Sequence, residues 1–64
     1  ILAAMRNWRV HVDFRTAAGE LVRWSYDVSR ETPAEAEDAA VREVLRQPGR
    51  EIVGVETEEI EPER

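Results

Sequence analysis

Two stretches of strictly alternating side chains, separated by a short glycine-containing loop, constrain this chain more than any other feature. In each stretch every second residue is apolar or aromatic, which is the pattern of a half-buried strand. The loop Ala17-Ala18-Gly19 favours a three-residue hairpin turn, because glycine readily adopts the left-handed conformation that the third position needs. The sequence therefore predicts a β-hairpin. Its inward-facing residues are Trp8, Val10, Val12 and Phe14 in the first strand and Val22, Trp24, Tyr26 and Val28 in the second.

The loop also predicts which residues of the two strands face each other. All inner pairs are then apolar or aromatic, and two outer pairs carry opposite charges. A slip by one residue would destroy both sets of pairs, so the register is strongly specified. The predicted inner pairs are Phe14–Val22, Val12–Trp24, Val10–Tyr26 and Trp8–Val28, and the outer pairs are Asp13–Arg23, His11–Ser25 and Arg9–Asp27.

A helix is predicted to follow the hairpin, from Thr32 to about Gln47. Thr32 is a good N-cap, Pro33 suits the first helical position, and Glu35 completes a capping box. Pro48-Gly49 ends the helix. The apolar stripe that we expect to face the sheet consists of Ala36, Ala40, Val41, Val44 and Leu45.

A third strand is predicted over residues 51–58. Its inward side chains would be Val53, Val55 and Thr57, and its outward residues Ile52, Gly54, Glu56 and Glu58. Because crossovers between parallel strands are right-handed, we expect this strand to lie beside the first one. The predicted fold is α+β: a ββαβ chain with a three-stranded antiparallel sheet in the order 2-1-3 and one helix packed on one face.

The chain divides into three parts by pattern. We expect an N-terminal arm over residues 1–6, a single domain over 7–58 and an acidic C-terminal tail over 59–64. Met5 would make a natural initiator, so residues 1–4 are expected to be either an upstream addition or a native arm that packs on the domain.

Composition narrows the chemistry open to this fold. All nine basic residues are arginine, there is no cysteine, and there is one histidine. Disulfides, cysteine-ligated metal sites and a lysine-dependent phosphate loop are therefore excluded. No cofactor or metal is expected. No apolar run approaches the roughly 18 residues of a membrane helix, so we expect a cytoplasmic protein with no membrane partner. The small core favours a homodimer.

The first half of the chain raises the possibility of nucleic-acid binding. Residues 1–30 carry five arginines against three acids, although the whole chain has a net charge of −5. Asp27 and Asp13 lie opposite two of these arginines, and Glu56 and Glu58 would join the same face, so we expect an ion-pair ladder there and no basic patch. The candidate nucleic-acid residues on this open sheet face are Arg9, His11, Arg15 and Arg23.

His11, Asp13 and Ser25 repeat the residue types of a catalytic triad on one face of the hairpin. An exposed, flat strand offers neither a pocket nor an oxyanion hole, however, so we expect no enzymatic activity.

The second half of the chain is acidic, with four arginines against eleven acids in residues 31–64. Acids near a helix N-terminus stabilise its dipole, which explains several of them. Arg42 and Arg46 are expected to pair with Asp38 and Glu43 on the helix. We expect a non-enzymatic module that binds another protein, with an acidic mimic of nucleic acid as an alternative. The candidate interaction surface is Glu35, Asp38, Arg42, Glu56 and Glu58.

Four segments carry a resemblance to known families: W-R-V-H-V-D-F, W-S-Y-D-V, A-E-A-E-D-A-A-V-R-E-V-L and I-V-G-V-E-T-E-E-I-E. Together they resemble small ββαβ accessory proteins of phages and actinobacteria. The order of strands and helix is also similar to that of the archaeal ribosomal LX domain. The first resemblance implies an accessory protein that binds a host or structural protein. The second implies binding to ribosomal RNA, from which this chain departs because it lacks lysine and is acidic.

Overall fold

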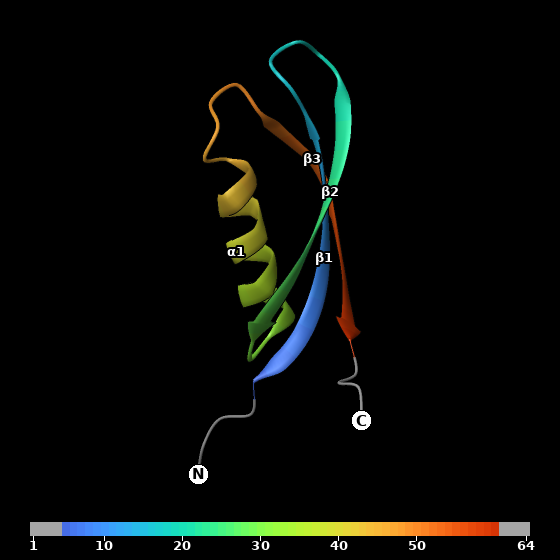
Figure 1. Cartoon of the computed structure of the whole chain (residues 1–64), viewed down its shortest axis with the longest axis vertical. Coiled ribbons are helices and arrows are strands. Elements are labelled where there is room, and N and C mark those ends of the chain that lie inside the picture. Colours follow the sequence, from blue (N-terminus) through green and yellow to red (C-terminus); the bar gives the residue numbers. More distant parts are fainter. Residues whose placement is uncertain (1–4, 61–64) are drawn as a thin grey trace.

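β1 (Arg6–Arg15) is the middle strand of the sheet in the computed structural model, which describes residues 5–60. β2 (Leu21–Arg30) and β3 (Glu51–Ile60) pair with β1 on either side, both antiparallel. α1 (Pro33–Val44) connects the two outer strands and lies across one face of the sheet (Figure 1). The predicted α+β fold, a ββαβ chain with strand order 2-1-3 and one helix on one face, is confirmed.

β1 and β3 extend beyond their predicted bounds. Arg6, which was expected in the N-terminal arm, begins β1, and Glu59 and Ile60, which were expected in the acidic tail, end β3. The remaining tail over 61–64 and the question of residues 1–4 lie outside the described residues.

The hairpin turn and its register match the sequence prediction. The amide of Gly19 donates to the carbonyl of Thr16 at 2.8 Å, and the amide of Thr16 donates to the carbonyl of Glu20 at 2.8 Å. Gly19 has a φ of 88°, which is the left-handed conformation that the turn requires. The pairing between β1 and β2 then runs without interruption along all ten residues of each strand, from Arg6↔Arg30 to Arg15↔Leu21.

The helix begins as predicted and ends earlier. The Thr32 hydroxyl accepts a hydrogen bond from the Glu35 amide at 3.2 Å and donates one to the Glu35 carboxylate at 3.0 Å. The last helical residue is Val44, whose carbonyl accepts a hydrogen bond from the Arg50 guanidinium at 3.0 Å. The prediction that Leu45 faces the sheet is wrong, because Leu45 lies at the C-cap and is 48% exposed.

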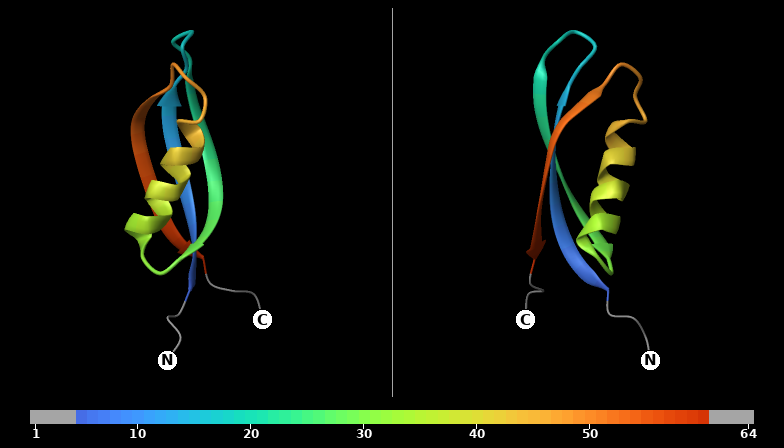
Figure 2. Two further views of the ribbon diagram at one scale, coloured as in Figure 1. Left: turned by 90° about the vertical axis from the view of Figure 1, so that its left-hand side faces the viewer. Right: turned by 180° about the vertical axis from the view of Figure 1, so that it is seen from behind.

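The core lies between β1 and α1. The helix turns the small side chains of Ala36 and Ala40 toward the sheet. The further views show α1 lying along one face of the sheet (Figure 2). Edge strand β2 contributes less than predicted, because α1 covers β1 more fully than its neighbours: Trp24 remains 41% exposed. The fully enclosed side chains are Trp8, Val10, Val12, Phe14, Ala36, Ala40 and Val44, with Val22, Tyr26, Val28, Ile52 and Val55 packed partly against them.

A bulge in β3 changes the predicted facing of two residues. Asp13 pairs with Gly54, but the next residue, Phe14, pairs with Ile52, so Val53 is an extra residue in the strand. Ile52 therefore packs against the core, while Val53 is 54% exposed, which is the reverse of the prediction. Beyond the bulge the predicted alternation holds, with Val55 turned toward the core.

Candidate functional site

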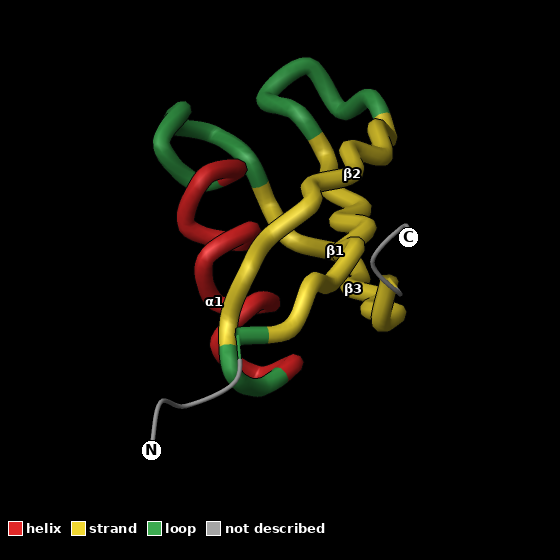
Figure 3. Tube along the Cα trace, turned by 60° about the horizontal axis from the view of Figure 1, so that its bottom comes forward, coloured by secondary structure: helices red, strands yellow, loops and turns green. Residues whose placement is uncertain are grey.

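Within residues 5–60, the sheet face opposite α1 carries no helix (Figure 3). That face displays a ladder of charged side chains. Two arginines hold the predicted cross-strand partners. Arg9 Nε lies 2.9 Å from Asp27 Oδ1, and Arg23 Nε lies 2.7 Å from Asp13 Oδ1. In each pair a second guanidinium nitrogen reaches the other carboxylate oxygen, so both contacts are bidentate.

These contacts shift the protonation equilibria of the partners. The hydrogen bonds from Arg23 hold the pKa of Asp13 below its usual value, and those from Arg9 do the same to the pKa of Asp27. Reciprocally, the hydrogen bonds to Asp13 and Glu56 raise the pKa of Arg23. Asp13, Asp27 and Arg23 are therefore ionised at neutral pH, and opposite charges hold these pairs together.

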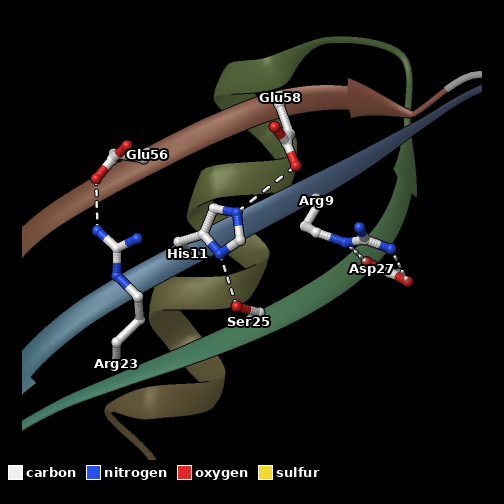
Figure 4. Close-up of polar contacts among 7 residues, drawn as sticks. All are labelled: Arg9, His11, Arg23, Ser25, Asp27, Glu56 and Glu58. Atoms are coloured by element: carbon white, nitrogen blue, oxygen red, sulfur yellow. Dashed lines mark hydrogen bonds and ion pairs between the residues drawn. The ribbon is translucent and has the colours of Figure 1, made fainter.

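β3 adds carboxylates to the same face, as predicted. Glu56 Oε1 lies 2.5 Å from Arg23 Nη2, and Glu58 Oε1 lies 3.7 Å from His11 Nε2 (Figure 4). On the helix side of the sheet, opposite Trp8, Glu59 pairs with Arg6 at 2.7 Å. Each contact joins β3 to another strand of the sheet.

The four candidate nucleic-acid residues do lie on one face, but they do not form a basic patch. Arg9 and Arg23 are neutralised by carboxylates, and His11 lies beside Glu58. The guanidinium of Arg15 donates to the Gly19 carbonyl at 3.2 Å and thereby braces the hairpin loop. The face resembles an ion-pair ladder more than a path for a phosphate backbone.

His11 does meet Ser25, with 2.6 Å between Nδ1 and Oγ. The carboxylate on the other side of the ring is Glu58, however, and Asp13, the predicted third member, is held by Arg23. Ser25 and Glu58 are exposed, His11 is half-buried, and the trio lies on an open sheet face (Figure 4). The arrangement can orient the imidazole, but it does not enclose a substrate.

The structure separates the five residues of the predicted protein-interaction surface. Glu35, Asp38 and Arg42 lie on α1, and Arg42 Nε is 3.0 Å from Asp38 Oδ2, as expected for that pair. Glu56 and Glu58 lie on the other side of the sheet, in the ladder described above. A single flat partner therefore cannot cover all five.

A shallow polar hollow between α1 and the end of β2 was not anticipated. Its walls hold three acids and three arginines, so the opposite charges balance. The residue that sequence reasoning missed is Arg30, whose even position on β2 places it on the same side of the sheet as Val28 and Tyr26. The hollow is lined by Arg30, Glu35, Asp38, Ala39, Arg42, Glu43 and Arg46.

Two further searches bear on the chemistry of the described residues. Within residues 5–60, no three histidine or carboxylate side chains gather closely enough to hold a metal ion. In the same part of the chain, no helix has the length and apolar character needed to cross a membrane.

No protein-family model, curated protein or solved structure matches the chain. Its surfaces are therefore the basis on which a function can be proposed.

Proposed function

We propose that this chain is a non-enzymatic protein-interaction module that binds a partner with a basic surface through the acidic edge of β3. The single observation that carries the proposal is the composition of that strand. β3 contains four acids and no base, and it forms one border of the sheet. We define the acidic edge as Glu51, Glu56 and Glu58, which lie opposite open-face residues of β1, whereas Glu59 lies on the helix side and is held by Arg6.

The acidic edge keeps unbalanced charge after its internal contacts are made. Arg23 approaches Glu56 but is already shared with Asp13. The side chains of Glu56 and Glu58 remain 67% and 62% exposed. The row of carboxylates is thus available to solvent, and it would steer a basic partner toward this border of the molecule.

Nucleic acid fits this surface less well than a protein does. A phosphate that approached Arg9 or Arg23 would have to displace a carboxylate that already holds the guanidinium through two nitrogens. The acidic edge itself repels a phosphate backbone. A partner groove that ordinarily holds nucleic acid is one kind of basic surface that the edge would suit, so mimicry is a special case of this proposal. A role as a phage or other accessory protein remains a prediction.

Photo-crosslinking in cells of the source organism tests the proposal. A benzophenone amino acid introduced at Val53 leaves every glutamate in place and sits beside the acidic edge on an exposed position. Leu45, which is 48% exposed just after α1, provides the matched control position. We expect a specific crosslinked protein from position 53 and not from position 45.

The same crosslink must depend on the carboxylates. The double variant E56Q/E58Q should reduce its yield, whereas E20Q, which removes a carboxylate from the hairpin loop, should not. A crosslink that forms equally in E56Q/E58Q contradicts the proposal. So would purified chain binding to an oligonucleotide at low salt, with an affinity that falls steeply as salt is added.

A further inference from the structure

The two borders of the sheet differ in how they are protected. On β3 the bulge at Val53 interrupts the strand, and the acidic edge repels a like strand. β2 has neither a bulge nor a row of like charges. Its ten residues contain no proline, and its register with β1 is regular throughout. Proteins normally cover or disrupt such a long, regular border, so β2 is the border built to receive another strand.

The free hydrogen-bonding groups of β2 can be assigned from the turn. Thr16 and Glu20 form a hydrogen-bonded pair, and such pairs alternate along an antiparallel ladder. The even-numbered residues of β2 therefore bond to β1. The backbone groups that point away from the sheet belong to Leu21, Arg23, Ser25, Asp27 and Ser29.

We propose that two copies of this chain join their β2 strands antiparallel about a two-fold axis at Ser25, forming a six-stranded sheet. Ser25 then faces Ser25 of the second copy, and their outward amides and carbonyls bond to each other. On the open face, Arg23 of each copy faces Asp27 of the other. On the helix side the facing pairs are Trp24–Tyr26 and Val22–Val28, and Glu20 faces Arg30 at the ends.

This register is the one in which β2 is complementary to itself. Centring the axis on Trp24 would place Asp27 opposite Leu21, and centring it on Tyr26 would place Val22 opposite Arg30. Centring it on Arg23 or Asp27 would bring like charges together. Only the Ser25 register among these pairs opposite charges on one face and apolar side chains on the other.

The side chains are able to make these extra contacts. The Asp27 carboxylate is 63% exposed in the single chain, and each of its oxygens can accept another hydrogen bond beside the one from Arg9. Trp24, which α1 leaves 41% exposed, would gain an aromatic neighbour. The dimer is separate from the proposed function, because both acidic edges stay at the outer borders of the joined sheet.

Single cysteines test the dimer and its register together, since the chain has none of its own. Residues in a hydrogen-bonded antiparallel pair have Cα atoms about 5.5 Å apart, which a disulfide can span. Under mild oxidation we expect S25C to form a covalent dimer of twice the 7.4 kDa chain, whereas W24C and Y26C do not. R23C and D27C should crosslink when they are mixed and remain largely monomeric when each is alone.

A backbone substitution tests the strand pairing without a disulfide. S25P removes an amide that points away from β1, so the hairpin keeps its own ladder. We expect it to raise the dimer dissociation constant about tenfold or more in sedimentation, while S25A, which keeps the amide, leaves it nearly unchanged. E59P, which places proline on the β3 border, serves as the matched control and should not dissociate the dimer.

Several outcomes would overturn the proposal. These are a native chain that sediments as a monomer throughout the micromolar range, rapid crosslinking of W24C or Y26C in place of S25C, and dissociation by E59P but not by S25P. If S25P fails to fold, the cysteine pairs still decide the register. A failed dimer leaves the Val53 crosslink intact, so the two proposals fail separately.

Discussion

Arg23 on β2 and Glu56 on β3 meet across the strand that separates them, with 2.5 Å between Nη2 and Oε1. The same guanidinium holds Asp13 on the middle strand at 2.7 Å. One arginine thus connects all three strands on the open face. Figure 4 shows its contact with Glu56. Because the two outer strands do not touch each other in the ladder, this contact is a direct link between the borders of the sheet.

Replacing Arg23 should weaken the fold more than replacing a helix arginine. R23M leaves Asp13 and Glu56 close together without the cation between them, whereas R42M removes one partner of Asp38 within a single helix. We expect R23M to lose more free energy of unfolding than R42M. Urea denaturation at low salt measures this, at protein concentrations where the chain is monomeric. Because salt screens exposed charges, the difference between the variants should narrow at high salt. If R23M and R42M lose equal free energy of unfolding, or if salt does not change the difference between them, Arg23 does not stabilise the sheet as a link between its borders.

The ladder also predicts a loss of stability in acid. The pKa values of Asp13 and Asp27 are lowered from 3.8 in the folded chain, mainly by the hydrogen bonds from Arg23 and Arg9. A lowered carboxyl pKa stabilises the fold above the unfolded value, and the benefit disappears as the pH falls through the folded value. We therefore expect the free energy of unfolding to fall below about pH 4, and to fall less steeply in D13N/D27N.

Carboxyl chemical shifts followed by NMR during an acid titration give the direct measurement. Both aspartates should titrate below 3.8 in the native chain. In R9M the midpoint of Asp27 should rise while that of Asp13 stays low. The variant R42M, on α1, controls for the loss of one positive charge. Midpoints at or above the ordinary value would contradict the proposed pairing.

Local chemistry explains why the hairpin and the ladder were predictable. The glycine at the third loop position specifies the turn, the turn specifies the register, and the register places Arg9 opposite Asp27. The start of the helix was predictable for the same reason, since the cap lies within four consecutive residues from Thr32 to Glu35.

The features that were mispredicted depend on packing between distant segments. An alternating sequence does not reveal an extra residue, so Ile52 and Val53 were assigned to the wrong faces. At the helix end, the Val44 carbonyl accepts a hydrogen bond from Arg50, which lies six residues further along the chain. The hollow beside Arg30 arises only when the end of β2 and α1 lie side by side. None of these has a local sequence signal.

Arg50 should contribute to stability through the aromatic residues that it covers. Its guanidinium carbon lies 4.4 Å from the centre of the Trp24 ring and 4.8 Å from that of Phe14, and it also bonds the last helical carbonyl. We expect R50A to lower the free energy of unfolding by about 1–2 kcal/mol. R50K keeps the charge but loses the planar stacking, so it should recover only part of the loss. R46A, at an exposed position just after the helix, should change the free energy of unfolding by no more than about 0.5 kcal/mol. If R50A and R46A are equivalent, the stacking has no energetic role.

Because of the bulge in β3, truncating each of two adjacent residues should change the free energy of unfolding by different amounts. Ile52 packs against the core, whereas Val53 is the extra, exposed residue. We expect I52A to lower the free energy of unfolding by about 1–2 kcal/mol, less than for a fully buried isoleucine, and V53A to change it by less than about 0.5 kcal/mol.

Deleting Val53 should preserve the fold, because Ile52 then remains opposite Phe14 in an uninterrupted ladder. Urea denaturation of the three variants measures these effects. A larger loss in V53A than in I52A would restore the simple alternation and place Val53 inside.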